Sequence, residues 1–356
     1  MSIIINLLLF IVILGCIVFI HEFGHFTFAK LTGVYVYEFA LGMGPKLFSY
    51  KPKNSETVYS IRAVPLGGFC SLAGEDIEND EKEVPKDRLL QSKKAWQRFL
   101  IMFMGPGFNF ISAFILLFMI GLIWGSPIST PKISDVTKNY PAYEVGLEKG
   151  DIVTELNGHK IKTMDDLSLY LTLAPHNKDS KIKVEKESGE VKEYSLLPKK
   201  EVTKVKGKEQ TTYRYGIELK TEKEYGFISA CKYMVVKTGS LFKQMGITVM
   251  YLFTGGVKLN QLSGPVGIYS IVGEQAKSGL SSIIYLIAYL SINVGFLNLL
   301  PIPAFDGGHI LFIIIEKIKG SPVSPELENK IHAIGLYLLL ALMLFITVND
   351  VLRLFK

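Results

Sequence analysis

The sequence has little charge and little cysteine for its 356 residues, and each shortage excludes a class of protein. Charged residues make up 20% of the chain, below the roughly 25% of soluble domains, and the mean hydropathy is +0.29. A purely soluble enzyme is therefore excluded. A chain lying wholly in lipid is excluded as well, because 39 basic and 33 acidic residues must contact water. The net charge of +6 gives no reason to expect nucleic acid as a partner.

The three cysteines, Cys16, Cys70 and Cys231, lie in different regions, and no Cys-x-x-Cys pattern is present. A zinc site made of cysteines is therefore not expected. On the membrane topology predicted below, only Cys231 is extracytoplasmic. An extracytoplasmic disulfide within one chain is thus excluded.

Basic residues are missing from the start of the chain, since no Lys or Arg precedes Lys30. The first apolar run thus lacks the positive start of a cleaved signal peptide, and a lipoprotein box around Cys16 is only a faint match. We expect this run to remain as a membrane span. Residues 30–98 hold eleven basic residues, so the positive-inside rule places them in the cytoplasm and the N-terminus outside.

Charge is also nearly missing from four long apolar windows, at residues 3–20, 99–124, 281–305 and 331–348. About 20 apolar residues cross the hydrocarbon core of a bilayer, so the windows predict four transmembrane helices. The long block between the second and third windows then lies outside, because long domains translocate largely regardless of charge. The C-terminus lies outside as well.

The end of the first window carries His21-Glu22-Phe23-Gly24-His25. Two histidines four residues apart lie on one helical face, and together they can bind Zn²⁺ while the Glu takes a proton from water. Chance alone predicts about 0.006 such patterns for this composition. The alternative is a polar helix end with two hydrogen-bonded histidines. Ionisable groups at membrane depth favour the metal interpretation.

Two histidines leave a catalytic zinc site incomplete, because such sites take three protein ligands and water. Asp306 is the only carboxylate between Glu274 and Glu316, and it follows two prolines that break the third window. Irregular backbone at membrane depth is tolerated where it lines a cavity or is buried in protein, so Asp306 is a candidate ligand. An ordinary helix stop is the alternative, and His309 is a competing ligand.

These two motifs resemble the site-2 protease family of intramembrane zinc metalloproteases, in its bacterial RseP/RasP-type branch. The second motif is Asn298-x-x-Pro301-x-Pro303-x-x-Asp306-Gly307. Further glycine motifs match across most of the chain: Gly42-Met43-Gly44-Pro45-Lys46, Pro65-Leu66-Gly67-Gly68-Phe69, Gly74-Glu75, Gly105-Pro106-x-x-Asn109 and Ser263-Gly264-Pro265-Val266-Gly267.

The resemblance implies one Zn²⁺ per chain, held by His21, His25 and Asp306, with Glu22 as the general base. It also favours Asp306 over His309 as the third ligand. Asn298 is implied to bind the substrate peptide or stabilise the oxyanion, as an amide N–H in a dry site can. The family usually has Leu before the ligand Asp, where this chain has Phe305. That departure affects the shape of the pocket rather than coordination.

Residues 57–64 are rich in β-branched residues and are bounded by turn residues, which predicts a strand. A small cytoplasmic hairpin is one interpretation. The resemblance supports a β-element that dips into the membrane and pairs with an unwound substrate by strand addition. The expected substrate strand comprises Thr57, Val58, Tyr59, Ser60 and Ile61.

The outside block alternates expected strands and short helices between residues 133 and 219, and residues 142–158 resemble a PDZ domain. Asn157-Gly158 is a strong hairpin signal, and Thr163 with Asp165 suits the start of a helix. PDZ domains capture chain ends by strand addition. The resemblance instead favours a size filter that blocks untrimmed substrates.

The predicted fold class is therefore a polytopic α-helical membrane protein with four transmembrane helices, a membrane-associated β-element and one extracytoplasmic PDZ-like domain. The expected segments are a first span with the zinc motif (1–31), a cytoplasmic-side β-rich loop (32–98), a second span (99–125), the PDZ-like domain (126–222), an amphipathic membrane-surface linker (223–280), a third span with the ligand Asp (281–306), a cytoplasmic loop (307–330), a fourth span (331–350) and a C-terminal tail (351–356).

The resemblance predicts a zinc endopeptidase that cuts transmembrane segments in regulated intramembrane proteolysis. It implies a multi-pass protein of the bacterial cytoplasmic membrane, with its active site near the cytoplasmic side. The expected substrates are single-span proteins already trimmed by another protease, such as anti-sigma factors or remnant signal peptides. A PDZ scaffold with a dead metal site and a metal transporter are the alternatives, and a transporter would not need Glu22.

Overall fold

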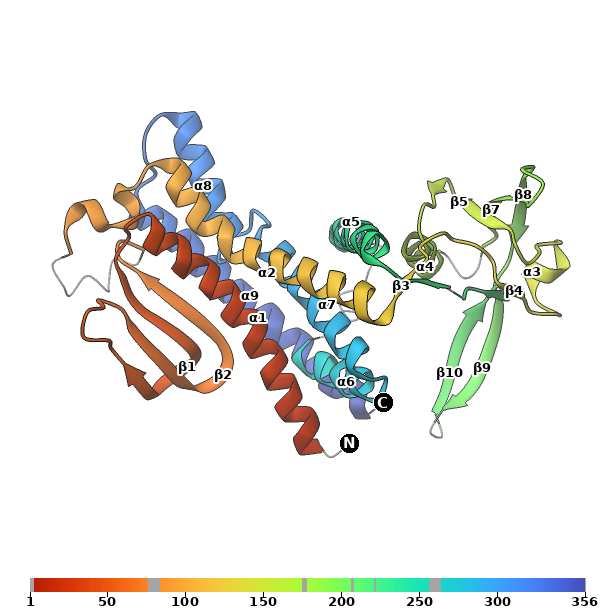
Figure 1. The fold of residues 1–356 in the computed structure, drawn as a ribbon, viewed down its shortest axis with the longest axis horizontal. Helices are drawn as coiled ribbons and strands as arrows, with labels where there is room; N and C mark the ends of the chain where they lie inside the picture. The colour runs from red at the N-terminus through yellow and green to blue at the C-terminus, as the bar shows by residue number, and fades with distance from the viewer. Residues whose placement is uncertain are drawn as a thin grey trace. The chain divides into compact units, whose positions relative to one another are not determined.

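The computed structural model describes residues 3–75, 84–174, 178–205, 208–220, 222–255 and 264–355, so Ser263 of the last glycine motif lies outside the described residues. The chain divides into two compact units. The first comprises Met1–Leu117 with Ile247–Lys356, and the second is Phe118–Gly246. Figure 1 shows the helices and strands of both.

Four helices of the described chain are long and apolar enough to cross a membrane. They are α1 (Ile3–Leu31), α2 (Ala95–Trp124), α7 (Leu280–Asn298) and α9 (Pro325–Phe355). This confirms the predicted number of spans. Large apolar side chains remain exposed on their outer faces, as on α9 with Leu336, Tyr337 and Leu338, which fits contact with lipid.

The spanning helices pack through apolar side chains and through glycines that admit a neighbour. A Cβ on Gly295 of α7 would lie 2.7 Å from the ring of Phe110 on α2, so the two helices approach closely there. Helix α1 packs against α6 (Pro265–Lys277) and α7. One buried cluster joins the three: Phe10, Ile13, Ile17, Val272, Leu286 and Leu290.

The third span ends earlier than the sequence predicts. Helix α7 stops at Asn298, and a non-helical segment, residues 299–305, connects it to α8 (Asp306–Lys319). We call this segment the connecting loop. The expected span 281–306 and cytoplasmic loop 307–330 do not describe this region, because Asp306 opens a new helix. Pro301 and Pro303 explain the break, since they lack N–H donors and fix φ.

Strands β1 (Val36–Tyr50) and β2 (Val58–Leu72) form a sheet beside α1 (Figure 1). Each strand bends in its middle, and glycines with positive φ lie at the bends, Gly42 at 89° and Gly67 at 104°. Phe39 consequently pairs with Cys70 and also with Tyr59.

Two carboxylates, Glu38 and Glu56, make hydrogen bonds and ion pairs that connect the strands of this sheet to each other and to neighbouring segments. Glu38 accepts hydrogen bonds from Ser60 and Arg62 and pairs with Lys46; burial opposes ionisation, but these partners outweigh it and lower the pKa of Glu38. Glu56 pairs with Arg88 and with Lys30 near the end of α1. The hydrogen bonds from Arg88, more than those from Lys30, lower the pKa of Glu56 from 4.5 to about 2.

In the second unit, a four-stranded sheet of order β6-β5-β7-β8 carries the core. Its strands are β5 (Ile152–Leu156), β6 (His159–Lys160), β7 (Ser180–Glu185) and β8 (Val191–Leu196). Asn157 (φ 49°) and Gly158 (φ 82°) make the β5–β6 turn, as the Asn-Gly pair predicts. The buried core residues are Ile133, Ala142, Leu147, Val153, Leu156, Ile161, Leu167, Ile182, Val184, Leu196 and Tyr215.

The predicted helix start at Thr163 is confirmed. Helix α4 (Met164–Leu173) begins with a capping box, in which Thr163 Oγ1 accepts from the Asp166 N–H and the Asp166 carboxylate accepts from the Thr163 N–H. Lys243 on α5 (Phe227–Phe253) lies 2.6 Å from that carboxylate; burial opposes the ionised form, but Lys243 and two backbone N–H groups lower the pKa of Asp166.

The remaining described elements are short. They are η2 (Lys86–Arg88), η3 (Leu90–Ser92), α3 (Pro141–Glu144), and the strands β3 (Ser126–Pro127), β4 (Asp135–Val136), β9 (Lys199–Val205), β10 (Lys208–Arg214), β11 (Ile217–Glu218) and β12 (Lys223–Glu224). The expected linker 223–280 thus contains two regular helices, α5 and α6. Asp350 of α9 accepts from the N–H groups of Gly264 and Gly267 and so caps α6.

Candidate metal centre

Helix α1 presents the two histidines of the first motif to one point. His21 and His25 are buried, 8% and 7% exposed, and lie one turn apart on an unbroken helix. Their Nε2 atoms are 3.2 Å apart, and their rings stand nearly perpendicular. Two imidazole nitrogens at this distance converge on a common partner.

The third predicted ligand reaches the same point from a distant part of the chain. Asp306 Oδ2 lies 3.2 Å from His21 Nε2, and Oδ1 lies 3.4 Å from His25 Nε2. The Asp306 side chain is 17% exposed. The structure therefore brings together the two motifs that the sequence separates by almost the whole length of the chain.

The three side chains fit a zinc ion. Ligand atoms about 2.05 Å from a tetrahedral Zn²⁺ lie about 3.3 Å from one another. The two Nε2 atoms are 3.2 Å apart, and each lies 3.2 or 3.4 Å from its nearer Asp306 oxygen, Oδ2 for His21 and Oδ1 for His25. Without a cation, two ring nitrogens and a carboxylate would face one another with too few protons among them. A His-His-Asp donor set therefore suits zinc in both spacing and chemistry.

Hydrogen bonds on the far side of each ring select the nitrogen that faces the centre. His25 Nδ1 donates to the Ile101 carbonyl at 2.8 Å, which leaves Nε2 with a free lone pair. His21 Nδ1 lies 3.3 Å from the side-chain amide of Asn109, a fully buried residue. The Asn109 oxygen as placed is buried without a partner among the described residues. If this amide is rotated by 180°, its oxygen accepts a hydrogen bond from His21 Nδ1, and His21 Nε2 then keeps a free lone pair.

Close approach of α1 and α2 makes these contacts possible. A Cβ on Gly24 would lie 2.0 Å from the Met104 carbonyl oxygen, and one on Gly105 would lie 2.1 Å from His25 Nε2. Gly105 contacts His25 and Asn109 contacts His21. Each helix contributes two residues one turn apart, and their opposite order along the two helices shows that the helices run antiparallel here. The Gly105-Pro106-x-x-Asn109 motif carries no predicted role from the sequence alone. Its four-residue spacing, equal to that of the histidines, was the available signal.

Glu22 is half-buried and lies on α1 directly after His21. A Cβ on Gly68 of β2 would lie 3.4 Å from Glu22 Cγ and 2.8 Å from the Ala40 carbonyl oxygen. The sheet therefore approaches α1 at the glutamate, and only glycine fits between them. Rings of α1 and the sheet pack around this point, with Phe26 5.2 Å from Phe39.

The two remaining predicted residues are Asn298 and His309. Asn298 is the half-buried last residue of α7 and precedes the connecting loop. His309, the competing ligand, belongs to a different group with Glu328 and His332. The geometry thus favours Asp306 over His309 as the partner of the two histidines.

The expected substrate strand lies inside the sheet. Tyr59 pairs with Phe39 and with Tyr50, and Ile61 pairs with Leu41 and with Phe48. A segment paired on both sides has no free edge, because its N–H and C=O groups are already used. Thr57, the first residue of the expected strand, is fully buried and donates to the Val36 carbonyl. The pairing on both sides therefore does not favour strand addition along Tyr59–Ile61.

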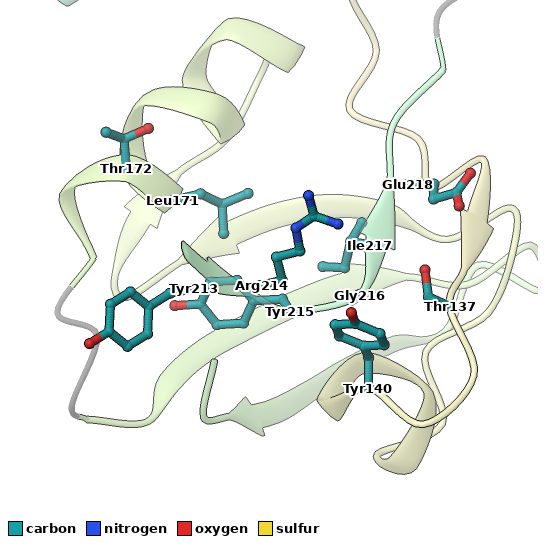
Figure 2. Close-up of a pocket in the computed structure, with 10 residues that line it drawn as sticks. All are labelled: Thr137, Tyr140, Leu171, Thr172, Tyr213, Arg214, Tyr215, Gly216, Ile217 and Glu218. Carbon is teal, nitrogen blue, oxygen red and sulfur yellow. The ribbon is translucent and has the colours of Figure 1, made fainter. Parts of the chain in front are cut away.

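The second unit holds a separate cavity of about 510 Å³ beside α4. Figure 2 shows Arg214 between Leu171 and Ile217, with Tyr140 below. Arg214 Nε lies 3.4 Å from Glu201. None of the residues that line this cavity is a predicted site residue.

A metal-binding centre among apolar, membrane-crossing helices is typical of a membrane metallopeptidase. Comparison with known proteins supports this class. The model of peptidase family M50 matches residues 9–342. Regulator of sigma-W protease RasP from Bacillus subtilis is 35% identical, with 97% of this chain and 98% of the relative aligned. Zinc metalloprotease RasP from Bacillus licheniformis is 32% identical over the same shares.

The chain therefore belongs to peptidase family M50, which confirms the resemblance to the site-2 proteases. It is a zinc metalloprotease of a membrane.

Proposed function

We propose that this protein is an endopeptidase that cuts membrane-spanning segments of other proteins, with one Zn²⁺ held by His21, His25 and Asp306. The observation that carries the proposal is the convergence of these side chains at zinc-like spacing. Bound zinc would supply Lewis-acid activation of water and of the scissile carbonyl. The Glu22 carboxylate takes a proton from the attacking water and delivers it to the leaving amide nitrogen.

The test is the substitution Glu22→Gln in the full-length protein in proteoliposomes, with a single-span reporter as substrate. We expect cleavage to be lost while one zinc per chain remains bound, because Gln keeps the shape but cannot accept the proton. The matched control is Glu75→Gln. Unchanged cleavage by the Glu22 variant would overturn the role of Glu22 as general base. No cleavage by the zinc-loaded unmodified protein would overturn the endopeptidase proposal and favour a transporter.

We also assign Asn298 to the substrate. Its position at the end of α7, just before the connecting loop, supports a side-chain amide that binds the substrate backbone or the developing oxyanion. Asn298→Ala should lower kcat about 100-fold while zinc content stays unchanged. Loss of zinc instead would make Asn298 a structural residue.

Substrate pairing with the sheet is better placed at residues 68–72. This segment pairs with β1 through Phe39–Cys70 and Ala40–Phe69, and no further described strand pairs with it. Gly68, at the start of this segment, lies next to Glu22, because a Cβ there would be 3.4 Å from Glu22 Cγ. An unwound substrate can add there as a new strand, which holds its carbonyls open to attack.

Proline scanning tests this edge. Neighbouring residues of a strand direct their N–H groups to opposite sides, so only one of Phe69 and Cys70 bonds to β1 through its N–H. Phe69→Pro and Cys70→Pro should differ: one destabilises the sheet, and the other keeps the melting temperature but loses cleavage. If the stable variant cleaves normally, the edge does not bind substrate.

We propose that residues 126–222 of the second unit form the PDZ-like domain and act as a size filter. The capped helix α4, the β5–β6 hairpin and the adjacent cavity support a peptide-binding module. A filter predicts that a trimmed substrate is cut faster than one with a folded external domain. A variant lacking residues 126–222 should cut both alike. If it cuts neither, although its zinc content is normal, the unit recruits substrates instead.

We further propose that both termini are extracytoplasmic and that the metal centre lies near the cytoplasmic face. The eleven basic residues of 30–98 support this orientation. In a cysteine-free background, an impermeant maleimide should label Lys149→Cys in intact cells and Lys51→Cys only after permeabilisation. The opposite pattern would invert the topology.

The proposed substrates are single-span proteins already trimmed by another protease, such as anti-sigma factors or remnant signal peptides. The similarity to a protein named regulator of sigma-W protease supports this class. Purified protein should release two fragments from such a peptide, and mass spectrometry would locate the cut within its apolar segment.

A further inference from the structure

The connecting loop that carries Asp306 has an unusual conformation. Ala304, two residues before Asp306, has φ 77°, one of three non-glycine residues with positive φ in the described chain. An L-residue in this region suffers a clash between its Cβ and the backbone. Pro301 and Pro303 contribute no N–H groups to hold the loop. Within the loop, the Ile302 N–H donates to the Leu300 carbonyl and the Phe305 N–H to the Ile302 carbonyl, whereas the Ala304 N–H bonds outside the loop.

Helix α9 contacts the loop at Ala304 and Pro303. His332 Nδ1 accepts a hydrogen bond from the Ala304 N–H at 3.1 Å. One turn further, a Cβ on Gly335 would lie 2.6 Å from Pro303 Cβ and 2.7 Å from its carbonyl oxygen. His332 and Gly335 share one helical face, three residues apart. This face holds the strained residue and the proline before it.

A second contact reaches the start of α8. A Cβ on Gly308 would lie 3.1 Å from His332 Cε1, so the histidine ring packs against the first turn of the helix that begins at Asp306. The ring also stacks on His309 at 3.8 Å, and His309 lies 3.1 Å from Glu328. The His332 ring therefore lies between the connecting loop and the first turn of α8 and contacts both.

The group His309, Glu328 and His332 has ligand atoms within 4.8 Å of one another, which raises a second metal site as an alternative. Two features oppose it. His332 Nδ1 is occupied as an acceptor, so its Nε2 carries the proton and has no lone pair. The two rings are stacked with an interplanar angle of 20°, whereas a shared ion must lie near the plane of both. The group is a packed support for the loop.

We propose that His332 is the positioning residue for Asp306, acting through the Ala304 N–H, with Gly335 providing the space for the loop. The proposal rests on the zinc-ligand role proposed for Asp306. Outer contacts that orient a ligand are worth about 10- to 100-fold in metal affinity, which sets the expected size of the effect.

Two matched amide variants test it. His332→Asn places its oxygen where Nδ1 lies and keeps the acceptor for Ala304. His332→Gln is equally polar but moves the oxygen one bond further out. We expect the zinc Kd, measured by chelator competition on the detergent-solubilised full chain, to rise about 10- to 100-fold for Gln and less than about threefold for Asn. Equal values for the two variants would overturn the proposal.

The visible absorption of the Co²⁺-loaded protein gives a second measurement, because it reports the ligand set directly. The His332→Gln spectrum should shift toward that of Asp306→Asn, and the His332→Asn spectrum should match the unmodified protein. His159→Gln, an exposed histidine of β6, is the control and should change neither Kd nor spectrum.

Should His332→Gln not fold, Gly335→Ala serves in its place, with the same expected rise in Kd and the same spectral shift. A Gly335→Ala protein that folds and binds zinc normally would overturn the proposal. Asp306→Asn separates the two hypotheses. If it leaves zinc affinity unchanged, the proposed ligand set fails; if it weakens zinc while His332→Gln does not, only the positioning role fails.

Discussion

His21 and His25 lie one turn apart on an unbroken helix, whereas Asp306 follows a connecting loop in which two prolines and a left-handed alanine interrupt the third span. The helix places its ligands by local periodicity, and α2 only adjusts their rings. The loop has no such periodicity, and its residues Ala304 and Pro303 contact His332 and Gly335 of α9. A metal centre inside a membrane can thus combine one rigid side with one side that neighbouring helices must hold.

The largest effects should come from the ligands themselves. His25→Ala and Asp306→Ala should each weaken zinc binding by more than the roughly 100-fold limit of outer-shell changes, since each removes a coordinate bond. Inductively coupled plasma mass spectrometry of the dialysed protein measures this. If the Asp306 variant retained one zinc per chain, the ligand that follows the connecting loop would not be needed for zinc binding, which would contradict the proposed ligand set.

Gly105→Ala should have the next largest effect. The added Cβ would lie 2.1 Å from His25 Nε2, so α2 must move away from α1. We expect a free energy of unfolding lower by about 1–3 kcal/mol. Zinc affinity should also fall by about 10- to 100-fold. Gly107→Ala, whose nearest neighbour is the flexible Met104 side chain, is the control in a thermal-unfolding assay.

Substitutions of Asn109 should change zinc affinity less, and they test how α2 orients the histidines of α1. Asn109→Leu should weaken zinc binding about tenfold, because His21 loses its orienting partner. Asn109→Asp should bind zinc at least as well as the unmodified protein, since a carboxylate accepts the Nδ1 proton of His21. Chelator competition measures both. Tighter binding by the Leu variant would contradict the rotated amide.

The smallest predicted effect concerns pH. The folded-state pKa of Glu56, about 2, lies below its ordinary 4.5, so its ion pairs stabilise the protein above pH 4.5. That contribution is lost as the pH falls from 4.5 toward 2. Glu56→Gln should lower stability by about 1 kcal/mol at pH 7, and the difference should vanish near pH 2. A difference that grows on acidification would show that the pairing is not stabilising.

The membrane spans and the two histidine ligands on α1 were largely predictable from the sequence. Four apolar windows predict four spans because lipid demands long uncharged helices. The His-Glu-x-x-His spacing places two ligands on one face because a helix has 3.6 residues per turn. The capping box at Thr163 and the Asn157-Gly158 turn were equally local.

The remaining errors have one cause. The two prolines predicted a break before Asp306, but continuous hydropathy did not show that α7 already ends at Asn298, since apolar residues fill both the helix and the connecting loop. Alternation of residues 57–64 predicts a strand but not its neighbours, so it could not show that Tyr59 is paired on both sides. Periodicity describes an element, and pairing describes a contact between elements.

By itself, therefore, the sequence determined the membrane spans, the identity of the chemistry-bearing residues and the family, because these depend on local periodicity and residue type. Only the tertiary structure decided that Asp306 meets the histidines, that Asn109 orients His21, and that His332 holds the loop. Those contacts join α1, α2, the connecting loop and α9 across large separations in sequence, where no local pattern fixes the distance between side chains.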